Sequence, residues 1–325
     1  MIMEEDELCF PQLLNTSCKR PKRPLSEIML IYTLPCIICL FTAALNLLVI
    51  VAISHYRQLH TPTNLLLLSL AVSDFIVGIQ QMPVGIVIWQ GCWFLGDIVC
   101  ILNSLLGFIT NTVSVGNMVL ISVDRYVAIC EPMYYHTKVT VTAVNLCVCL
   151  CWMFSVLYSS WILRDLFKKP DRYVSCYGEC AVAISYIEGT VDFILTFAGP
   201  ITVIVVLYMR VFVVAVSQAR AMRSHVSVVK LQFSVNVAAK KSELKAARNL
   251  GVVVVVFLLC FSPYYFLSVK GGNNLDVALQ IYLLYFNSCL NPVIYALFYP
   301  WFRKAVKHIV TLQILQPGSC ETKML

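Results

Sequence analysis

Seven apolar stretches constrain this chain more than any other feature of its sequence. Each is long enough to cross about 30 Å of hydrocarbon as a helix, and helices of this length satisfy their own backbone hydrogen bonds in lipid. Hydrophobic residues make up 59% of the 325 residues, which is high for a soluble domain. We therefore predict an all-α membrane protein, a bundle of seven transmembrane helices. The stretches are residues 28–54, 63–89, 100–124, 140–163, 182–209, 248–269 and 277–299.

The whole chain, residues 1–325, is predicted to be a single domain built on this bundle. Residues 1–27 precede the first span, and residues 300–325 are expected to form a short amphipathic eighth helix and a tail. The first residues, "MIMEEDELCF", are acidic and lack a short apolar core, so we expect no cleaved signal peptide. The first span is then expected to start membrane insertion itself.

The charges of the loops predict the orientation. The 209–249 loop is rich in Lys and Arg, and so is the segment after residue 299, which places both on the cytoplasmic side. An odd number of spans then puts the N-terminus outside the cell, where Asn15 heads an Asn-Thr-Ser glycosylation sequon. Because the basic residues cluster in loops, the net charge of +7 is no sign of nucleic-acid binding.

Six cysteines fall on the predicted outer side, and their full pairing allows 15 connectivities. Cys100 lies at the top of the third span and Cys180 just before the fifth. A bridge between them would hold the second outer loop over the mouth of the bundle. Either Cys18 or Cys9 could join the N-terminus to Cys176, and free thiols are the alternative for some of the six.

Two groups of polar residues within the spans have the composition of functional sites. In "SVDRYVAIC", Arg125 stands beside Asp124, and Glu243 is a second candidate partner, so the guanidinium could change partners as a switch. The alternative is an ordinary interfacial arginine. Asp74 lies in the middle of the second span, where a carboxylate needs a partner or a cation. We expect it to bind Na⁺, or else to join a hydrogen-bonded network, with oxygens from Ser114, Asn287, Ser288 and Asn291.

One characteristic residue or motif in each of the seven spans resembles the rhodopsin-like, class A G protein-coupled receptors. These are Asn46, Asp74, "DRY" at 124–126, Trp152, Pro200 with Tyr208, Pro263, and "NPVIY" at 291–295. The resemblance covers almost the whole chain. It implies a switch for G protein coupling that consists of Asp124, Arg125, Tyr126, Tyr208, Glu243 and Tyr295.

A narrower resemblance is to the trace amine-associated receptors. It rests on "NSCLNPVIYALFYPWF" at 287–302, "CWFLGDIVC" at 92–100, "CFPQLLNTSCKR" at 9–20 and the extra Cys176 before Cys180. The family has an additional disulfide between the N-terminus and the second outer loop, which favours Cys18 as the partner of Cys176. By resemblance the chain couples to a stimulatory or olfactory G protein, raises cyclic AMP, meets arrestin and a receptor kinase, and resides in olfactory cilia.

The position of the amine-binding carboxylate departs from the usual family pattern. Members typically hold the ligand's amine with an aspartate of the third helix, and here that position is Gly107. The stretch "GTVDFILTFAGP" instead places Asp192 in the outer half of the fifth span. A branch of fish receptors resembles this pattern, which implies an amine bound in a reversed orientation. Phe261 also stands where many class A receptors have Trp.

Physical reasoning supports a cationic ligand independently. An aspartate within a span costs roughly 2.5–3.5 kcal/mol on insertion scales, so it should face the bundle interior. The alternative is a structural carboxylate that bonds to Thr112 or Asn111. Glu188, one turn above, could serve a second ammonium or only attract cations at the rim. The expected ligand-binding residues are Asp192, Glu188, Phe108, Asn111, Thr112, Thr196, Phe261, Tyr264, Tyr265 and Tyr285.

The predicted function is therefore a plasma-membrane receptor for an extracellular protonated amine, with no enzymatic activity. The first rival is a class A receptor for a non-amine ligand. The second, a seven-span transporter or channel, is disfavoured because the chain shows no internal repeat. An enzyme is disfavoured because all five histidines lie in or near predicted cytoplasmic segments.

Overall fold

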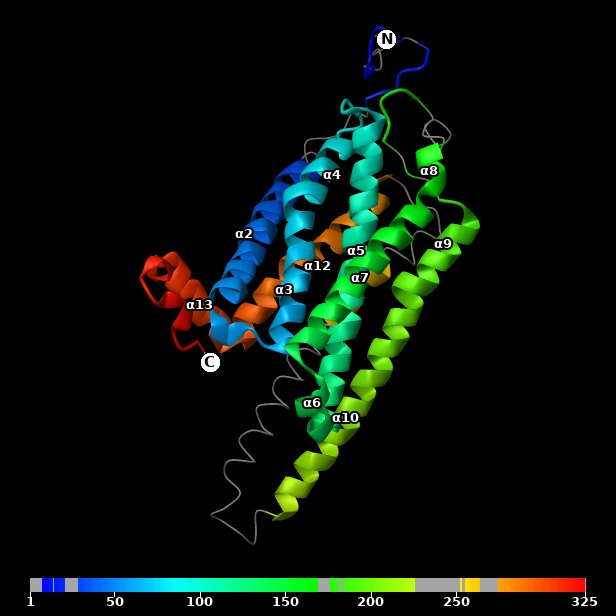
Figure 1. The fold of residues 1–325 in the computed structure, drawn as a ribbon. Coiled ribbons are helices and arrows are strands. Elements are labelled where there is room, and N and C mark those ends of the chain that lie inside the picture. The colour runs from blue at the N-terminus through cyan, green and yellow to red at the C-terminus, as the bar shows by residue number, and fades with distance from the viewer. Residues whose placement is uncertain are drawn as a thin grey trace.

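Long apolar helices run side by side in the structure, a computed structural model, with the N- and C-terminal segments at opposite ends (Figure 1). The structure describes residues 8–13, 15–20, 29–168, 176–180, 182, 184–225, 252, 255–263 and 274–324. Five spans in these ranges are long and apolar enough to cross a membrane, and a sixth is counted if the bent pair at the C-terminal end is one span. Residues 255–263, inside the expected span 248–269, are helical.

The helices follow the predicted stretches closely at most ends. The first span is η1 (Met29–Thr33) with α2 (Leu34–His55), and the second is α3 (Pro62–Ile76), η3 (Val77–Gln81) and α4 (Met82–Trp89). The third is α5 (Gly96–Cys130) and the fourth is α7 (Val141–Ile162). The fifth is α9 (Tyr186–Asp192), η5 (Phe193–Ala198) and α10 (Gly199–His225), and α12 (Asn274–Phe298) is the last. Short connecting helices are η2 (Arg57–Leu59), α6 (Pro132–Lys138) and α8 (Arg164–Lys168).

Hydroxyl side chains start several of these helices. Thr61 precedes Pro62 and accepts a hydrogen bond from the Asn64 N–H, and Thr140 does the same for Ala143. Ser185 and Glu188 form a capping box at the start of α9, in which each side chain meets the other residue's backbone N–H. These caps satisfy backbone groups that the helix itself leaves unpaired.

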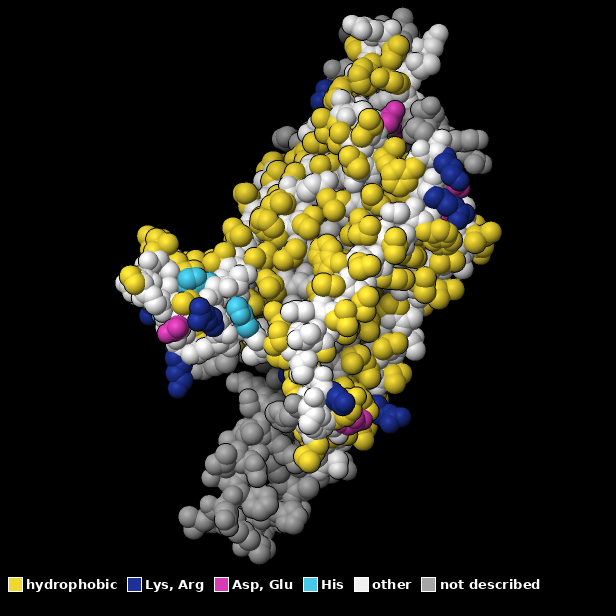
Figure 2. Space-filling model, viewed as in Figure 1, with side chains coloured by type: hydrophobic (Ala, Val, Ile, Leu, Met, Phe, Trp, Pro, Cys, Tyr) yellow, Lys and Arg dark blue, Asp and Glu magenta, His cyan; other side chains and the backbone are white. Residues whose placement is uncertain are grey.

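The helices bury one continuous core and turn another apolar face outward. Ile53, Leu67, Met118, Phe257 and Tyr295, from different helices, are at most 1% exposed and belong to one cluster. In contrast, Leu146, Leu150, Met153 and Leu157 of α7 are 53–69% exposed. Figure 2 shows such hydrophobic side chains covering the visible face, with charged side chains towards its ends. This is the distribution expected of a bundle whose solvent is lipid.

Three disulfides tie the outer segments together. The structure pairs Cys100 with Cys180 and Cys18 with Cys176, as expected from the sequence. It also pairs Cys9 with Cys92, two cysteines for which the sequence indicated no definite partner. The N-terminal segment is thus joined to both the first and the second outer loop.

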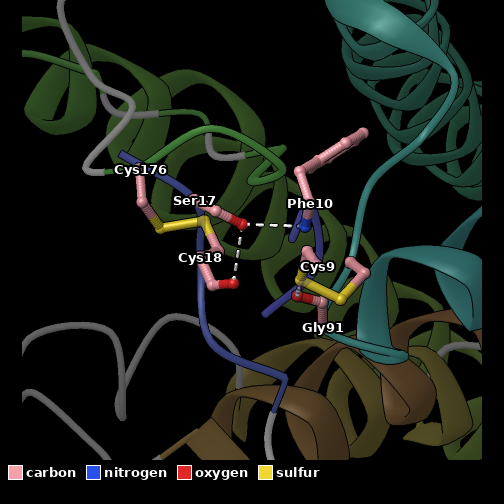
Figure 3. The surroundings of a disulfide bond; sticks show 7 residues. Cys9, Phe10, Ser17, Cys18, Gly91 and Cys176 are labelled. Carbon is pink, nitrogen blue, oxygen red and sulfur yellow. Dashed lines mark hydrogen bonds between the residues drawn. A yellow bond between two sulfur atoms is a disulfide. The ribbon is translucent and has the colours of Figure 1, made fainter. Parts of the chain in front are cut away.

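The N-terminal segment forms a small ordered layer around two of these bridges (Figure 3). The Phe10 N–H donates to Ser17 Oγ at 2.8 Å, and the Cys18 N–H donates to the Tyr177 carbonyl at 2.9 Å. Gly178 adopts φ +104°, and a Cβ there would lie 3.0 Å from the Phe10 ring, so this close approach favours glycine. Asn15, the sequon asparagine, is exposed on this layer.

At the opposite end, the C-terminal segment folds back on the bundle. The helix α13 (Pro300–Val310) makes a 94° bend with the preceding span and matches the expected eighth helix. Two single turns follow, η6 (Gln313–Leu315) and η7 (Ser319–Glu321). Ser319 Oγ lies 2.9 Å from His55 Nε2, and the Met324 N–H donates to Gln58 Oε1 at 3.1 Å. Met324 is 3% exposed, so the tail docks on the loop between the first two spans.

Candidate functional site

The carboxylate of Asp192 is buried in the outer half of the fifth span. It is the last residue of α9, is 7% exposed, and precedes the π-helical segment η5. Such turns widen a helix and often occur at functional sites. Tyr158 of α7 donates its hydroxyl to Asp192 Oδ1 at 2.9 Å, and the Thr196 hydroxyl donates to the Asp192 backbone carbonyl at 2.7 Å.

The partner of Asp192 differs from the ones that the sequence suggested. Thr112 and Asn111 were the expected partners of a structural carboxylate, but Thr112 donates to the carbonyl of Phe108 in its own helix at 2.8 Å. Tyr158 lies 34 residues from Asp192 in the chain. No local spacing rule connects a tyrosine of the fourth span with an aspartate of the fifth, so only the packing of α7 against the fifth span reveals this contact.

Glu188 is already held by the protein. It is 3% exposed, and Arg164 of α8 forms a salt bridge with Glu188 Oε1 at 3.2 Å. The Arg164 guanidinium also lies 5.2 Å from the centroid of the Trp161 ring. Together with the capping box at Ser185, this ion pair shows that Glu188 helps to hold the start of α9 in position.

The expected aromatic residues that the structure describes lie at different places in the bundle. Phe108 packs on a cluster that contains Tyr158, and Phe261 is buried in the main core with its ring 4.1 Å from that of Phe257. Tyr285 of α12 lies near Gly85, where a Cβ would be 3.5 Å from its ring. Tyr264 and Tyr265 lie outside the described residues.

Gly107 of the third span lies against the amide side chain of Gln81. A Cβ on Gly107 would lie 2.9 Å from Oε1 of Gln81, which comes from the second span. An aspartate could therefore not be accommodated at 107 unless Gln81 moved. Sequence reasoning did not single out Gln81 as the neighbour of this position.

Asp74 is fully buried among oxygen- and amide-bearing side chains. Asn291 Nδ2 donates to Asp74 Oδ2 at 2.8 Å, Ser114 Oγ donates to Oδ1 at 3.5 Å, and Asn46 Nδ2 donates to the Ser288 carbonyl at 3.0 Å. The Oδ1 atoms of Asn46, Asn287 and Asn291 are buried without a hydrogen-bond partner among the described residues. A carboxylate with neutral oxygens around it is a donor set that fits a hard cation.

Arg125 is held by its neighbour at the other end of the third span. Its Nε donates to Asp124 Oδ2 at 2.9 Å, while Thr63 donates to the same oxygen at 2.9 Å and Tyr135 to Oδ1 at 3.1 Å. Burial raises the pKa of Tyr135, so its hydroxyl remains a donor over the physiological range. Asp124 is thus one of the two expected partners, and Glu243 lies outside the described residues.

The remaining switch residues are placed as follows. Tyr295 is fully buried in the core with its ring 6.1 Å from that of Tyr299, and Tyr208 packs against the same core. Tyr126 packs on the small cluster of Ile129 and Val211, which joins α5 to α10. These contacts connect the third, fifth and seventh spans at the end where Arg125 lies.

Comparison with known proteins gives consistent matches. Residues 45–295 match the family model described as 7 transmembrane receptor (rhodopsin family). The chain is 33% identical to trace amine-associated receptor 13c of Danio rerio, over 99% of this chain and 97% of that protein. It is 34% identical to trace amine-associated receptor 1 of Macaca mulatta, over 96% of each chain. It is 33% identical to the Homo sapiens receptor of that name, again over 96% of each.

Proposed function

Because the chain belongs to the rhodopsin family of seven-transmembrane receptors and, within it, to the trace amine-associated receptors, we propose that it detects an extracellular protonated amine through Asp192. As a member of that family it is a multi-pass plasma-membrane receptor for a small molecule and a partner of G proteins, and it is not an enzyme. The relatives' names refer to trace amines, which supports the ligand class.

The observation that carries this proposal is a buried negative charge without a cationic side chain among its described contacts. Asp192 is 7% exposed, and its carboxylate accepts a hydrogen bond from the neutral hydroxyl of Tyr158. At about 4 Å and an effective dielectric near 20, an ammonium would gain roughly 4 kcal/mol of gross attraction. Desolvation of the ligand offsets part of that gain. The neutral pair Gly107 and Gln81 offers no competing anion.

Signalling in this proposal runs from Asp192 to Arg125. The ligand must bind the active arrangement more tightly than the inactive one, because a ligand with equal affinity shifts nothing. The active arrangement frees Arg125 from Asp124 to meet a stimulatory or olfactory G protein, and cyclic AMP rises. With the N-terminus outside the cell, the opposite end meets this G protein, an arrestin and a receptor kinase. The proposed site of action is the olfactory cilium.

A Na⁺ ion at Asp74 is part of the same proposal. The ion would neutralise the buried carboxylate, and the unpaired amide oxygens of Asn46, Asn287 and Asn291 would complete its ligands. Its binding would favour the inactive arrangement, in which these residues surround Asp74.

The function is tested by exposing cells that express the chain to a panel of mono-, di- and methylated amines and measuring cyclic AMP. Neutral analogues in which a methyl or hydroxyl group replaces the amine serve as matched controls. The expected result is a response to at least one amine and none to its neutral analogue. The proposal is contradicted if neutral odorants activate the receptor and no ammonium compound does.

One observation favours a second candidate, a class A receptor for a non-amine ligand. The Tyr158 hydrogen bond gives Asp192 a partner within the protein, so the carboxylate could be structural. However, the side-chain partners of Asp192, Tyr158 and Thr196, are neutral hydroxyls, which leave its negative charge without a counter-charge. A cationic ligand would supply that counter-charge.

Changing Tyr158 to Phe tests how the carboxylate is held. The variant removes one hydrogen bond from Asp192, so the carboxylate is less well positioned for the ligand. We expect the EC50 for an amine agonist to rise about tenfold, which corresponds to about 1.4 kcal/mol, as measured by cyclic AMP at equal surface expression. Tyr186→Phe, at a 90% exposed position of α9, is the control. If the two variants have equal EC50 values, the hydrogen bond from Tyr158 does not position Asp192 for the ligand.

A further inference from the structure

The C-terminal tail, residues 311–324, folds back on the loop between the first two spans. Leu312 and Gly318 adopt left-handed conformations, with φ values of 57° and 78°, and these residues turn the chain beside α13 (Figure 1). As a result, η7 (Ser319–Glu321) packs on η2 (Arg57–Leu59). The tail thus lies on a segment more than 250 residues earlier in the chain, since the hydrogen bond between the two joins positions 266 residues apart.

Two hydrogen bonds join the tail to the end of α2 and to the loop. Ser319 Oγ donates to the Ile314 carbonyl at 2.6 Å and lies 2.9 Å from His55 Nε2. A hydroxyl has a single hydrogen, so His55 Nε2 is the donor of the second contact. The Met324 N–H donates to Gln58 Oε1 at 3.1 Å. These bonds give the tail one defined position on the loop.

Burial of Met324 is the largest contribution to this docking. Its side chain is 3% exposed and belongs to the same core cluster as Tyr56 and Leu59, which are both 0% exposed. The salt bridge between Arg57 and Glu321, at 3.8 Å, joins side chains that are each 73% exposed. Such exposed pairs contribute little. A change at Met324 is therefore the most direct way to undock the tail.

The loop that holds the tail leads directly into the residues that hold Arg125. The Leu59 carbonyl accepts a hydrogen bond from Asn64 Nδ2 at 3.0 Å, which ties the loop to the first turn of α3. The preceding residue, Thr63, donates to Asp124 Oδ2 at 2.9 Å and accepts from the Arg125 guanidinium. A movement of the loop would therefore disturb the hydrogen bonds of Arg125.

The docked tail coexists with the arrangement in which Arg125 is held by Asp124 and Thr63. A contact shifts an equilibrium between two arrangements only if it is stronger in one of them. The continuous path from Met324 through the loop to Thr63 gives the tail such a preference, because the loop position that buries Met324 is also the one that sets Thr63 against Asp124.

We propose that the docked tail is an autoinhibitory brace, which stabilises the arrangement with Arg125 held and is released when the receptor becomes active. This inference goes beyond the amine site, but it rests on the proposed function because it requires signalling through Arg125. The brace acts without a ligand, so its effect is seen in the basal activity of the full chain.

The first test measures cyclic AMP without agonist, at equal surface expression. Met324→Glu would place a carboxylate in an apolar site, so the tail should undock. We expect the basal signal to rise about fivefold, at the lower end of typical coupling between two sites. Gln58→Ala removes the acceptor of the Met324 N–H and should raise the signal by a smaller factor. Lys323→Gln, at the exposed neighbouring position, changes the net charge by the same amount as Met324→Glu and should leave the signal unchanged.

The second test asks whether the brace acts through Thr63. Thr63→Val keeps the branched shape of the side chain but removes the hydroxyl that contacts Asp124 and Arg125. In this background, Met324→Glu should add little to the basal signal, because the link between the loop and Arg125 is already broken. A full fivefold rise in the double variant would show that the tail acts by another route.

The outcomes separate the brace from the proposed function. The brace is refuted if Met324→Glu and Gln58→Ala both leave basal cyclic AMP unchanged or lower it while the unmodified receptor still responds to an amine, and the proposed function then stands. If the unmodified receptor and every variant leave cyclic AMP unchanged with and without amines, both proposals are wrong.

Discussion

Asp192→Asn is expected to raise the EC50 for a primary amine agonist by about 100-fold or more. Truncating one partner of a buried, hydrogen-bonded charge pair costs about 2–5 kcal/mol, and each 1.4 kcal/mol is about tenfold in affinity. Asparagine keeps the shape of the side chain and can still accept from Tyr158, so the structural contact at 2.9 Å survives. The variant therefore removes the charge alone, and concentration–response curves of cyclic AMP measure its effect.

The matched control for this variant is Asp97→Asn, at an exposed position in the first turn of α5. It removes an equal charge from the surface and should change the EC50 little, since exposed charges are screened by solvent and salt. An Asp192→Asn receptor that reaches the surface and keeps full potency would show that the carboxylate serves the fold and not the ligand.

The second large effect is expected from Cys100→Ser. This variant opens the bridge to Cys180, which ties the second outer loop to the top of α5 just before α9 begins. Loss of a native disulfide typically costs about 2–5 kcal/mol, so the melting temperature of the solubilised receptor should fall by roughly 5–15 °C. Amine potency should fall as well, because α9 carries Asp192.

Thermal unfolding and surface labelling of the same variants check this result. Cys149→Ser, at an exposed and unpaired position of α7, is the control and should melt with the unmodified receptor. The prediction fails if the Cys100→Ser receptor melts at the same temperature and binds amine as before.

Membrane spans are the part of this fold that sequence reasoning recovers best. Hydrocarbon thickness sets the length of an apolar helix, so α7 (Val141–Ile162) begins and ends within one residue of the predicted 140–163. The same rule fails beyond the membrane. The helix α10 continues to His225, whereas 209 was predicted, because a helix in water can continue with polar residues.

Contacts between spans were harder to predict. The extra cysteine at 176 indicated a staple to the N-terminus, but Cys9 and Cys92 form one pair among many allowed by six cysteines. The contacts of Tyr158 with Asp192 and of Gln81 with Gly107 each join residues of different helices. Helix periodicity fixes which face a residue occupies, but it does not say which residue of another helix lies opposite.

The docked tail has a practical consequence for reporter design. Receptors of this kind are commonly followed with a luminescent or fluorescent protein fused after the last residue. Here the penultimate residue, Met324, is packed into the core, and its backbone N–H donates a hydrogen bond to Gln58. A reporter protein fused there without a linker would lie against the turn between the first two spans. An energy-transfer signal from it would change when this segment is released as well as when a transducer binds.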